Sequence, residues 1–303
     1  MPGSRRRGAD DGRVGLVVVD KERGWTSHDV VARCRRLFGQ RRVGHAGTLD
    51  PDATGVLLVG LGRFTRMLRF LSALRKTYEA EVVLGVATDT LDASGVEVAR
   101  FDMSGVGIDE VRTAAEALTG EIEQVPPMVS ALKVEGRRLH ELARQGIEVE
   151  RRPRPVTVYR FDVGPSATSE PGVFAVSVEC STGTYVRTLA ADLGAALGGG
   201  AHLRNLRRTK VGSFGTDEAH RLDELGADHI LTPAQALRDL SQVAVDGERQ
   251  RSVSHGLALE RGDLGVDGTG PWALVDGRGR LLAVYEDGGA DRLVPAAVLA
   301  SAG

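Results

Sequence analysis

The spacing of apolar and polar residues along the chain predicts short strands and helices in alternation. Residues 14–19 and 56–61 are almost continuously apolar, which is typical of buried strands. Further strands are predicted at 76–84, which begins with polar–apolar alternation, and at 156–163 and 173–180. We expect helices over residues 28–38, 64–74, 108–118 and 185–197. This mixture predicts an α+β fold with a central mixed, largely antiparallel sheet flanked by helices, followed by a small β module.

The texture of the sequence changes at three places, which predicts how the chain is divided. Residues 1–12 are small, polar and charged, so we expect a flexible tail. The main domain is expected over residues 13–238. Within it, residues 124–152 begin with a Pro-Pro pair and continue with a basic helix, which predicts a semi-independent insertion. Residues 242–303 contain short strands with glycine-rich turns, which predicts a small, separate, mostly β module.

The net charge of −2 conceals an uneven distribution of acidic and basic residues. Residues 217–303 carry 15 acids and 8 Lys or Arg, a balance of −7, so residues 1–216 have a balance of +5. A basic body favours a polyanionic partner, although an uneven solvated surface explains the charge equally well. No apolar run reaches the roughly 18 residues of a membrane span, and no signal-peptide pattern follows the N-terminal arginines. We therefore expect a cytoplasmic protein without membrane contact.

Sequence motifs for metals and common cofactors are missing. Cys34 and Cys180 are far apart, which predicts two reduced thiols rather than a disulfide framework or a metal site. The seven histidines never fall at ligand spacing. No phosphate-binding loop or dinucleotide fingerprint is present, and neither Ser130 nor Ser181 lies in a nucleophile elbow. Candidate chemistry must therefore come from carboxylate, arginine and tyrosine side chains.

Residues 43–55 form the stretch on which the candidate chemistry depends. Their three glycines and one proline break helices and central strands, so we expect a structured loop that leads into the strand at 56–61. Asp50 precedes Pro51, which restricts its backbone to an extended conformation. A lone aspartate in such a loop is more often a turn-former than a catalyst. The case for Asp50 therefore depends on residues elsewhere in the chain.

The segment Gly44-His45-Ala46-Gly47-Thr48-Leu49-Asp50-Pro51-Asp52-Ala53-Thr54-Gly55 resembles the catalytic motif of the TruB family of tRNA pseudouridine-55 synthases. Blocks similar to that family continue in the same order through residues 20–27, 76–78, 88–90, 130–133, 180–188, 200–203 and 206–208. Residues 242–303 resemble, more weakly, a PUA-like RNA-binding module. Two departures are Glu22, where the family usually has proline, and the arginine-rich segment 63–68.

The resemblance implies an enzyme that converts uridine-55 in the T-loop of tRNA into pseudouridine. In that reaction the C1′–N1 bond breaks, the uracil turns over, and C5 bonds to C1′, with no metal, nucleotide or redox cofactor. Asp50 would be the essential carboxylate, acting either as a nucleophile or as a base. Arg187 would pair with Asp50 and orient it. Burial would raise the pKa of Asp50, and the guanidinium would lower it again.

The resemblance also implies how the RNA is held. The target base cannot be reached inside the folded T-loop, so it must be flipped out. Tyr78 would act in catalysis by stacking on that base, Tyr185 and Leu206 would line its pocket, and His45 would occupy the vacated space in the RNA.

The partner implied by the resemblance is the T-stem-loop of tRNA. Arginines within residues 33–42 and 204–210 would bind phosphates, and residues 124–152 would close over the RNA loop like a thumb. We expect a monomer that needs no guide RNA. The alternative is a non-catalytic tRNA-binding or tRNA-folding protein on the same scaffold. A subunit of an RNA-guided synthase is disfavoured because the C-terminal module is short.

Overall fold

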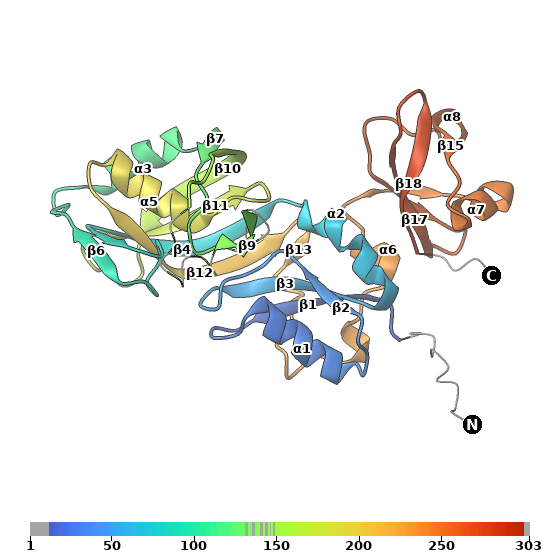
Figure 1. Ribbon diagram of the computed structural model, residues 1–303, viewed down its shortest axis with the longest axis horizontal. Coiled ribbons are helices and arrows are strands. Elements are labelled where there is room, and N and C mark those ends of the chain that lie inside the picture. Colours follow the sequence, from blue (N-terminus) through green and yellow to red (C-terminus); the bar gives the residue numbers. More distant parts are fainter. Residues whose placement is uncertain are drawn as a thin grey trace.

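The computed structural model describes residues 12–130, 133–134, 137–139, 142, 145, 147 and 149–299. It confirms the predicted fold class, with one large mixed sheet flanked by helices and a smaller sheet made by the C-terminal residues (Figure 1). The tail expected over residues 1–12 lies outside the described residues, except for its last position.

The large sheet has nine strands in the order β1–β3–β12–β4–β11–β10–β7, with β2 beside β3 and β13 beside β12. Only β3 and β12 pair in parallel, and every other neighbouring pair is antiparallel. The strands are β1 (Gly15–Lys21), β2 (Val43–Ala46), β3 (Thr54–Leu61), β4 (Lys76–Leu84), β7 (Gly120–Gln124), β10 (Arg154–Pro165), β11 (Val173–Cys180), β12 (Ala201–Val211) and β13 (Phe214–Gly215).

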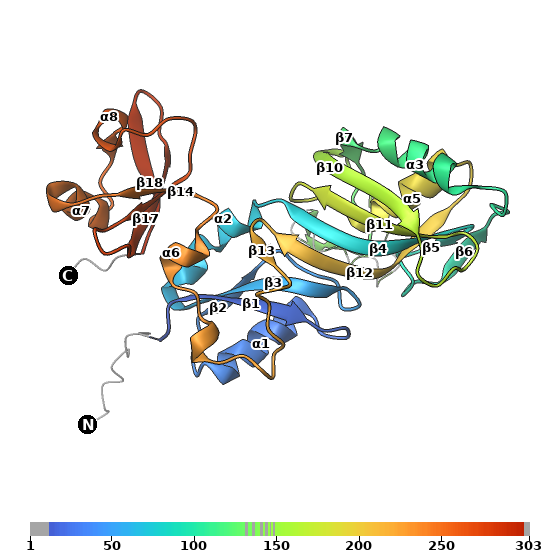
Figure 2. The ribbon, with the colours of Figure 1, turned by 180° about the vertical axis from the view of Figure 1, so that it is seen from behind.

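Alternate residues of the first strands pack into two hydrophobic clusters on opposite faces of the sheet. Val17 and Val19 join the cluster that contains helices α1 (Ser27–Leu37), α3 (Ile108–Ala117) and α5 (Val186–Ala196). Leu16 and Val18 join the cluster that contains η1 (Gly62–Met67), α2 (Leu68–Ser72) and α6 (Pro233–Ala236). Strands β10, β11, β4 and β12 have one open face, which Figure 2 shows from the front. One solvated face is usual for an antiparallel sheet.

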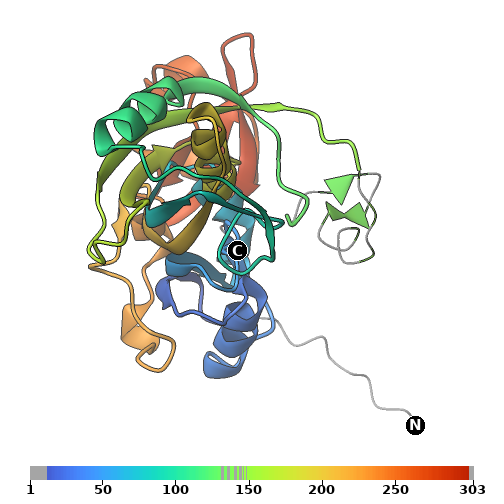
Figure 3. The same ribbon diagram turned by 90° about the vertical axis from the view of Figure 1, so that its left-hand side faces the viewer.

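Smaller elements decorate this body. They are the hairpin β5 (Val86–Thr88) with β6 (Glu97–Arg100), the hairpin β8 (Lys133–Val134) with β9 (Arg137–Arg138), and η2 (Ala227–His229). The β8–β9 hairpin stands away from the sheet (Figure 3). The basic helix expected after residue 136 is wrong at Arg137 and Arg138, which form a strand, and much of that prediction falls outside the described residues. The helix expected over 64–74 is instead the 3-10 helix η1 followed by α2.

The prediction that residues 43–55 form only a loop is wrong at both ends, since β2 pairs with β3 at the start and Thr54 and Gly55 already belong to β3 at the end. Gly44 and Gly60 are direct cross-strand partners in this pair. A Cβ atom on Gly44 would lie 3.2 Å from the Leu68 side chain, and one on Gly60 would lie 2.9 Å from it. A side chain at either glycine would therefore crowd Leu68. The two glycines leave room for α2 to pack closely on the sheet.

The C-terminal residues form a five-stranded sheet in the order β14–β16–β17–β18–β15, with two short helices. The elements are β14 (Ser241–Ala244), α7 (Gly247–Ser254), β15 (Leu259–Glu260), α8 (Arg261–Leu264), β16 (Trp272–Val275), β17 (Leu281–Asp287) and β18 (Arg292–Val298). Ala273, Val275 and Val284 share a hydrophobic cluster with Phe64 and Met67 of η1, so this sheet packs on the body through apolar side chains. Among the described residues, no helix is long and apolar enough to cross a membrane.

Candidate active site

The segment that carries Asp50 lies where β3 changes its neighbour. Its C-terminal half pairs with β2 through Leu58–Leu61, whereas Thr54 and Gly55 at its start pair with β12. Residues 47–53 connect β2 to β3, so the loop lies at the junction between the two neighbours. The sheet therefore fixes both ends of the Asp50 loop.

Side chains and backbone groups from the preceding segment hold the loop itself. The Ser27 hydroxyl accepts a hydrogen bond from the Leu49 amide at 2.9 Å and donates to the Leu49 carbonyl at 3.2 Å. The Lys21 ammonium and the Gly24 amide both donate to the Pro51 carbonyl, at 3.1 and 2.9 Å. Lys21 and Ser27 are fully buried or nearly so. Asp50 is thus presented by a loop whose backbone polar groups on both sides are paired.

Arg187 lies beside Asp50 and joins it to a second carboxylate. Its Nη2 is 3.1 Å from Asp50 Oδ2, and its Nη1 is 3.3 Å from Asp92 Oδ2. The same guanidinium donates to the carbonyls of Thr90 at 3.0 Å and Val129 at 2.9 Å. Only 5% of the Arg187 side chain is exposed. The four partners leave the guanidinium little freedom, so it fixes the direction in which Asp50 points.

The electrostatic surroundings raise the pKa of the Asp50 carboxyl above its usual value. Burial is the largest cause, although 42% of the side-chain surface is exposed, and the charges of Asp92 and Asp52 act in the same direction. Arg187 and Lys21 oppose the rise. The two nearby cations therefore offset part of the cost that burial and the neighbouring carboxylates place on the ionised form of Asp50.

Tyr78 lies close to this group, on the side of the sheet that carries α5. It is 8% exposed and belongs to the same hydrophobic cluster as Leu49 and, at the edge of the cluster, Leu206. Burial raises the pKa of the Tyr78 hydroxyl, and the negative charge of Asp50 contributes to the rise. Leu206 lies in an irregular part of β12, between Arg204 and Arg207 in the pairing with β4. The structure therefore brings Tyr78 and Leu206 to the Asp50 side of the sheet.

Tyr185 precedes α5 and is held through its backbone. The buried amide of Gln124 accepts from the Tyr185 amide at 2.7 Å and donates to the Tyr185 carbonyl at 3.2 Å. This clasp fixes the start of the helix whose second residue is Arg187. Gln124 is thus a residue that the sequence reasoning missed, because its partner is 61 positions away.

His45 lies on β2, just before the loop. Its ring meets that of His28 edge-on, with centroids 5.6 Å apart, and its Nδ1 has no hydrogen-bond partner among the described residues. Burial, together with the charges of His28 and Arg208, lowers the pKa of His45 to about 4. The imidazole is therefore neutral near pH 7.

Three arginines of the basic stretch at 204–210 are paired or buried, whereas Lys210 is exposed, and the phosphate contacts of this stretch stay a prediction. Arg204 pairs with Glu81 and Glu170, Arg207 pairs with both carboxylate oxygens of Asp20, and Arg208 is fully buried. Counting basic residues along the sequence could not reveal these partners. Within 33–42, by contrast, Arg36 and Arg41 are exposed.

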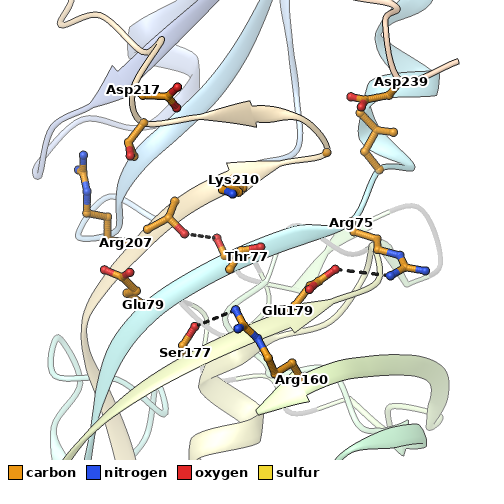
Figure 4. Close-up of a pocket in the computed structure, with 14 residues that line it drawn as sticks. Arg75, Thr77, Glu79, Arg160, Ser177, Glu179, Arg207, Lys210, Asp217 and Asp239 are labelled. Carbon is orange, nitrogen blue, oxygen red and sulfur yellow. Dashed lines mark hydrogen bonds and ion pairs between the residues drawn. The ribbon is translucent and has the colours of Figure 1, made fainter. Parts of the chain in front are cut away.

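One depression on the described surface lies away from Asp50. It has a volume of about 920 Å³ and lies over the open face of the sheet (Figure 4). Its lining includes Thr77 and Glu79, which alternate along β4 with Tyr78 and therefore face the other way. Arg75 pairs with Glu179 there at 3.5 Å. These paired charges are those of a solvated sheet face.

Two further residues at the site were missed in the sequence. Asp92 comes from the loop between β5 and β6, where Thr90 and Ser94 donate to its other oxygen. The abundance of Asp, Ser and Thr in this loop indicated only a turn. Lys21 was identified only as part of the segment 20–27, which resembles a block of the TruB family. Among the described residues, no group of three His, Cys, Asp or Glu side chains is placed to hold a metal ion.

Comparison with solved structures defines the class of fold. The chain superposes with a TM-score of 0.70 on a chain of the crystal structure of a Cbf5–Nop10–Gar1 complex, at 27% identity, covering 90% of this chain and 78% of that one. A second match, a structure of an H/ACA RNP bound to a substrate RNA, has a TM-score of 0.69 at 24% identity and covers 95% and 84% of the two chains. The protein is therefore an α+β protein of the Cbf5-like fold.

Sequence comparison narrows this class to a family. Residues 35–186 match the N-terminal domain of the TruB family of pseudouridylate synthases, and residues 187–243 match the C-terminal domain of tRNA pseudouridylate synthase B. The tRNA pseudouridine synthase B of Rhodococcus jostii is 48% identical over 91% of this chain and 90% of its own. That of Thermobifida fusca is 47% identical over 90% and 94%. The chain belongs to the TruB family of pseudouridine synthases.

Proposed function

We propose that this chain isomerises uridine-55 in the T-loop of tRNA to pseudouridine. The observation that carries the proposal is the Asp50–Arg187 ion pair, at 3.1 Å, on a loop whose backbone is held from several sides. The family supports the choice of reaction, since its relatives in Rhodococcus jostii and Thermobifida fusca are named tRNA pseudouridine synthase B. The named substrate of those relatives also supports tRNA as the partner.

The reaction needs a carboxylate rather than a redox group. The C1′–N1 bond breaks, the uracil turns over, C5 bonds to C1′, and the proton lost from C5 is balanced by one gained at N1. Asp50 acts on the nucleotide as a nucleophile or as a base, and Arg187 keeps it ionised and directed at the substrate. The fixed geometry supplies proximity without reorganisation at the moment of reaction.

The flipped base binds on the Asp50 side of the sheet. Tyr78 stacks on it, and Tyr185 and Leu206 complete the pocket. Stacking on an aromatic ring contributes about 1–3 kcal/mol, which offsets the few kcal/mol needed to unstack the base. His45, which is neutral near pH 7, enters the space that the base leaves in the RNA without adding a charge there.

The rest of the RNA is held by phosphate contacts and by two accessory segments. Exposed arginines at the end of α1 and in the connection to β2, such as Arg36 and Arg41, bind the phosphate backbone. Residues 124–152 act as the thumb, and residues 242–303 form a PUA-like RNA-binding module after the catalytic domain at 13–238. The protein works in the cytoplasm as a monomer, without a guide RNA.

The decisive assay measures tritium release from C5-labelled uridine in a T-stem-loop, with purified protein alone. Wild type is expected to release tritium, and Asp50→Asn is expected to release none while its Kd for the RNA stays within a few-fold. Asparagine keeps the shape of the side chain but cannot act as a carboxylate. Tight binding without release by wild type would favour the alternative, a non-catalytic tRNA-binding protein. Equal turnover by Asp50→Asn would remove Asp50 from the mechanism.

A further inference from the structure

Arg208 is the largest fully buried side chain in the described part of the protein, and it lies beneath the Asp50 loop. Its Nε donates to the Val56 carbonyl at 2.8 Å, and its Nη2 donates to the Gly47 carbonyl at 3.1 Å. Its Nη1 is 3.5 Å from the Thr48 carbonyl. The guanidinium therefore joins the first residues of the loop to the strand that follows it, with Asp50 between them.

No carboxylate forms an ion pair with this guanidinium among the described residues. A buried cation without a counter-ion is costly, and a stable protein core is usually built without one. Its donors bind the Gly47 carbonyl of the loop and the Val56 carbonyl of β3. The protein thus buries this guanidinium at a place where its donors hold the loop against β3.

The backbone around Arg208 reinforces the same contact. Gly55 pairs with Arg208 in the parallel part of the sheet, and its φ of +100° is open to glycine but strained for other residues. A Cβ atom on Gly55 would lie 2.2 Å from the Arg208 carbonyl oxygen. At Gly47, with φ of +80°, a Cβ would meet Arg208 Nη1 at 3.5 Å. Glycine at position 55 therefore lets β3 approach the Arg208 backbone this closely, whereas at Gly47 the contact is ordinary and only the positive φ favours glycine.

Arg208 is also the cross-strand partner of Tyr78 in the pairing of β12 with β4. The loop that carries Asp50 and the strand that carries Tyr78 thus meet at one residue. We propose that Arg208 is a positioning residue, whose fork of hydrogen bonds to the loop carbonyls sets the place of Asp50 relative to Tyr78. This inference rests on the proposed function of the site.

Substitution of Arg208 by lysine or by methionine separates the charge of the side chain from its planar arrangement of hydrogen-bond donors. Arg208→Lys keeps the charge but replaces the planar fork by one ammonium group, which cannot span the same carbonyls. Arg208→Met keeps the length and removes both charge and donors. A displacement of about 1 Å at a catalytic group costs on the order of 10²-fold in rate. We therefore expect both variants to lose about 10²-fold in kcat, with the Kd for the T-stem-loop within a few-fold of wild type.

The test measures single-turnover tritium release and RNA binding for wild type, both variants and Arg160→Gln. Arg160 is an exposed arginine on the open face of the same sheet, so its loss should leave kcat unchanged. Guanidinium ion added to Arg208→Ala should restore part of kcat, whereas methylammonium should not, because only guanidinium reproduces the fork. The pKa of His45, followed through its ring proton resonances, supplies a second readout, since the charge of Arg208 contributes to lowering that pKa.

The outcomes distinguish failure of the proposed function from failure of the positioning role of Arg208. No turnover by wild type would refute the proposed function. Wild-type turnover by a folded Arg208→Lys would overturn the positioning role, even if Arg208→Met fails to fold. Failure of both variants to fold would make Arg208 a requirement of folding and would also overturn it. A loss confined to the Kd would assign Arg208 to RNA binding instead.

Discussion

Gly55 offers a quantitative test of how closely the sheet must hold the Asp50 loop. In Gly55→Ala the new Cβ would lie 2.2 Å from the Arg208 carbonyl oxygen, where ordinary contact begins at 3.4 Å, so β3 and β12 must separate by about 1.2 Å. The positive φ costs about 1–3 kcal/mol for a residue other than glycine, and overpacking adds about 1–3 kcal/mol. We expect Gly55→Ala to lower the free energy of unfolding by about 2–6 kcal/mol.

Gly120 provides a matched control for the backbone term. Its φ of +101° is nearly the same as that of Gly55, but a Cβ there would meet nothing within 4 Å. Gly120→Ala should therefore cost only the conformational strain, about 1–3 kcal/mol, and leave kcat unchanged. Urea unfolding measures the free energies, and tritium release measures kcat, which should fall on the order of 10²-fold in Gly55→Ala alone. Equal effects of the two substitutions on stability and on kcat would refute the close-approach argument.

Two further predictions concern protonation. Because burial and, to a lesser extent, the charge of Asp92 raise the pKa of Asp50, the acid limb of the kcat profile should lie above the usual range of an aspartate. Asp92→Asn should move this limb to lower pH, and a limb that stays in place would contradict the charge coupling. Burial lowers the pKa of Lys21 to about 8, so the unfolded chain binds more protons than the folded one from about pH 8 to the unfolded pKa of about 10.4. Stability should therefore gain a favourable contribution as pH rises through that window. Urea midpoints at pH 8 and pH 10 should show a smaller gain in Lys21→Met than in wild type, and an identical gain would exclude Lys21 as its source.

Local patterns predicted the strands and helices best where one face of the element determines its burial. Residues 173–180 were predicted as a strand, and β11 has those bounds: an apolar start is followed by alternation of buried and half-buried residues from Val176 to Cys180. The helix predicted at 28–38 is α1, which a capping box at Thr26 and Asp29 begins at Ser27. Residues 64–74 were harder, because a 3-10 turn and an α-helical turn share the same apolar spacing over so short a segment.

The candidate site was less visible from the sequence, because its parts meet only through long-range contacts. Asp50 and Arg187 were named from a resemblance, and the structure places them 3.1 Å apart. Asp92 had no signal beyond a turn-forming loop, since its contact with Arg187 depends on where the β5–β6 loop lies relative to α5 in the folded chain. The basic residues near 204, by contrast, gave a strong sequence signal for a free basic surface, but Arg204 and Arg207 have acidic partners in the fold. Linear charge says nothing about whether Glu81 or Asp20 will meet those arginines.

The hydrogen bonds of Gln124 and Val129 link the base of the 124–152 insertion to the site. Gln124 clasps the backbone of Tyr185, and the Val129 carbonyl accepts from the same Arg187 nitrogen that contacts Asp50. Any shift of Val129 would therefore alter the contacts of the guanidinium itself. If the 124–152 segment moves on RNA binding, an RNA that fits poorly would leave Arg187 without its Val129 contact and Asp50 less well oriented. Such a linkage would let the fit of the whole RNA loop govern the speed of the chemical step, a form of induced-fit discrimination.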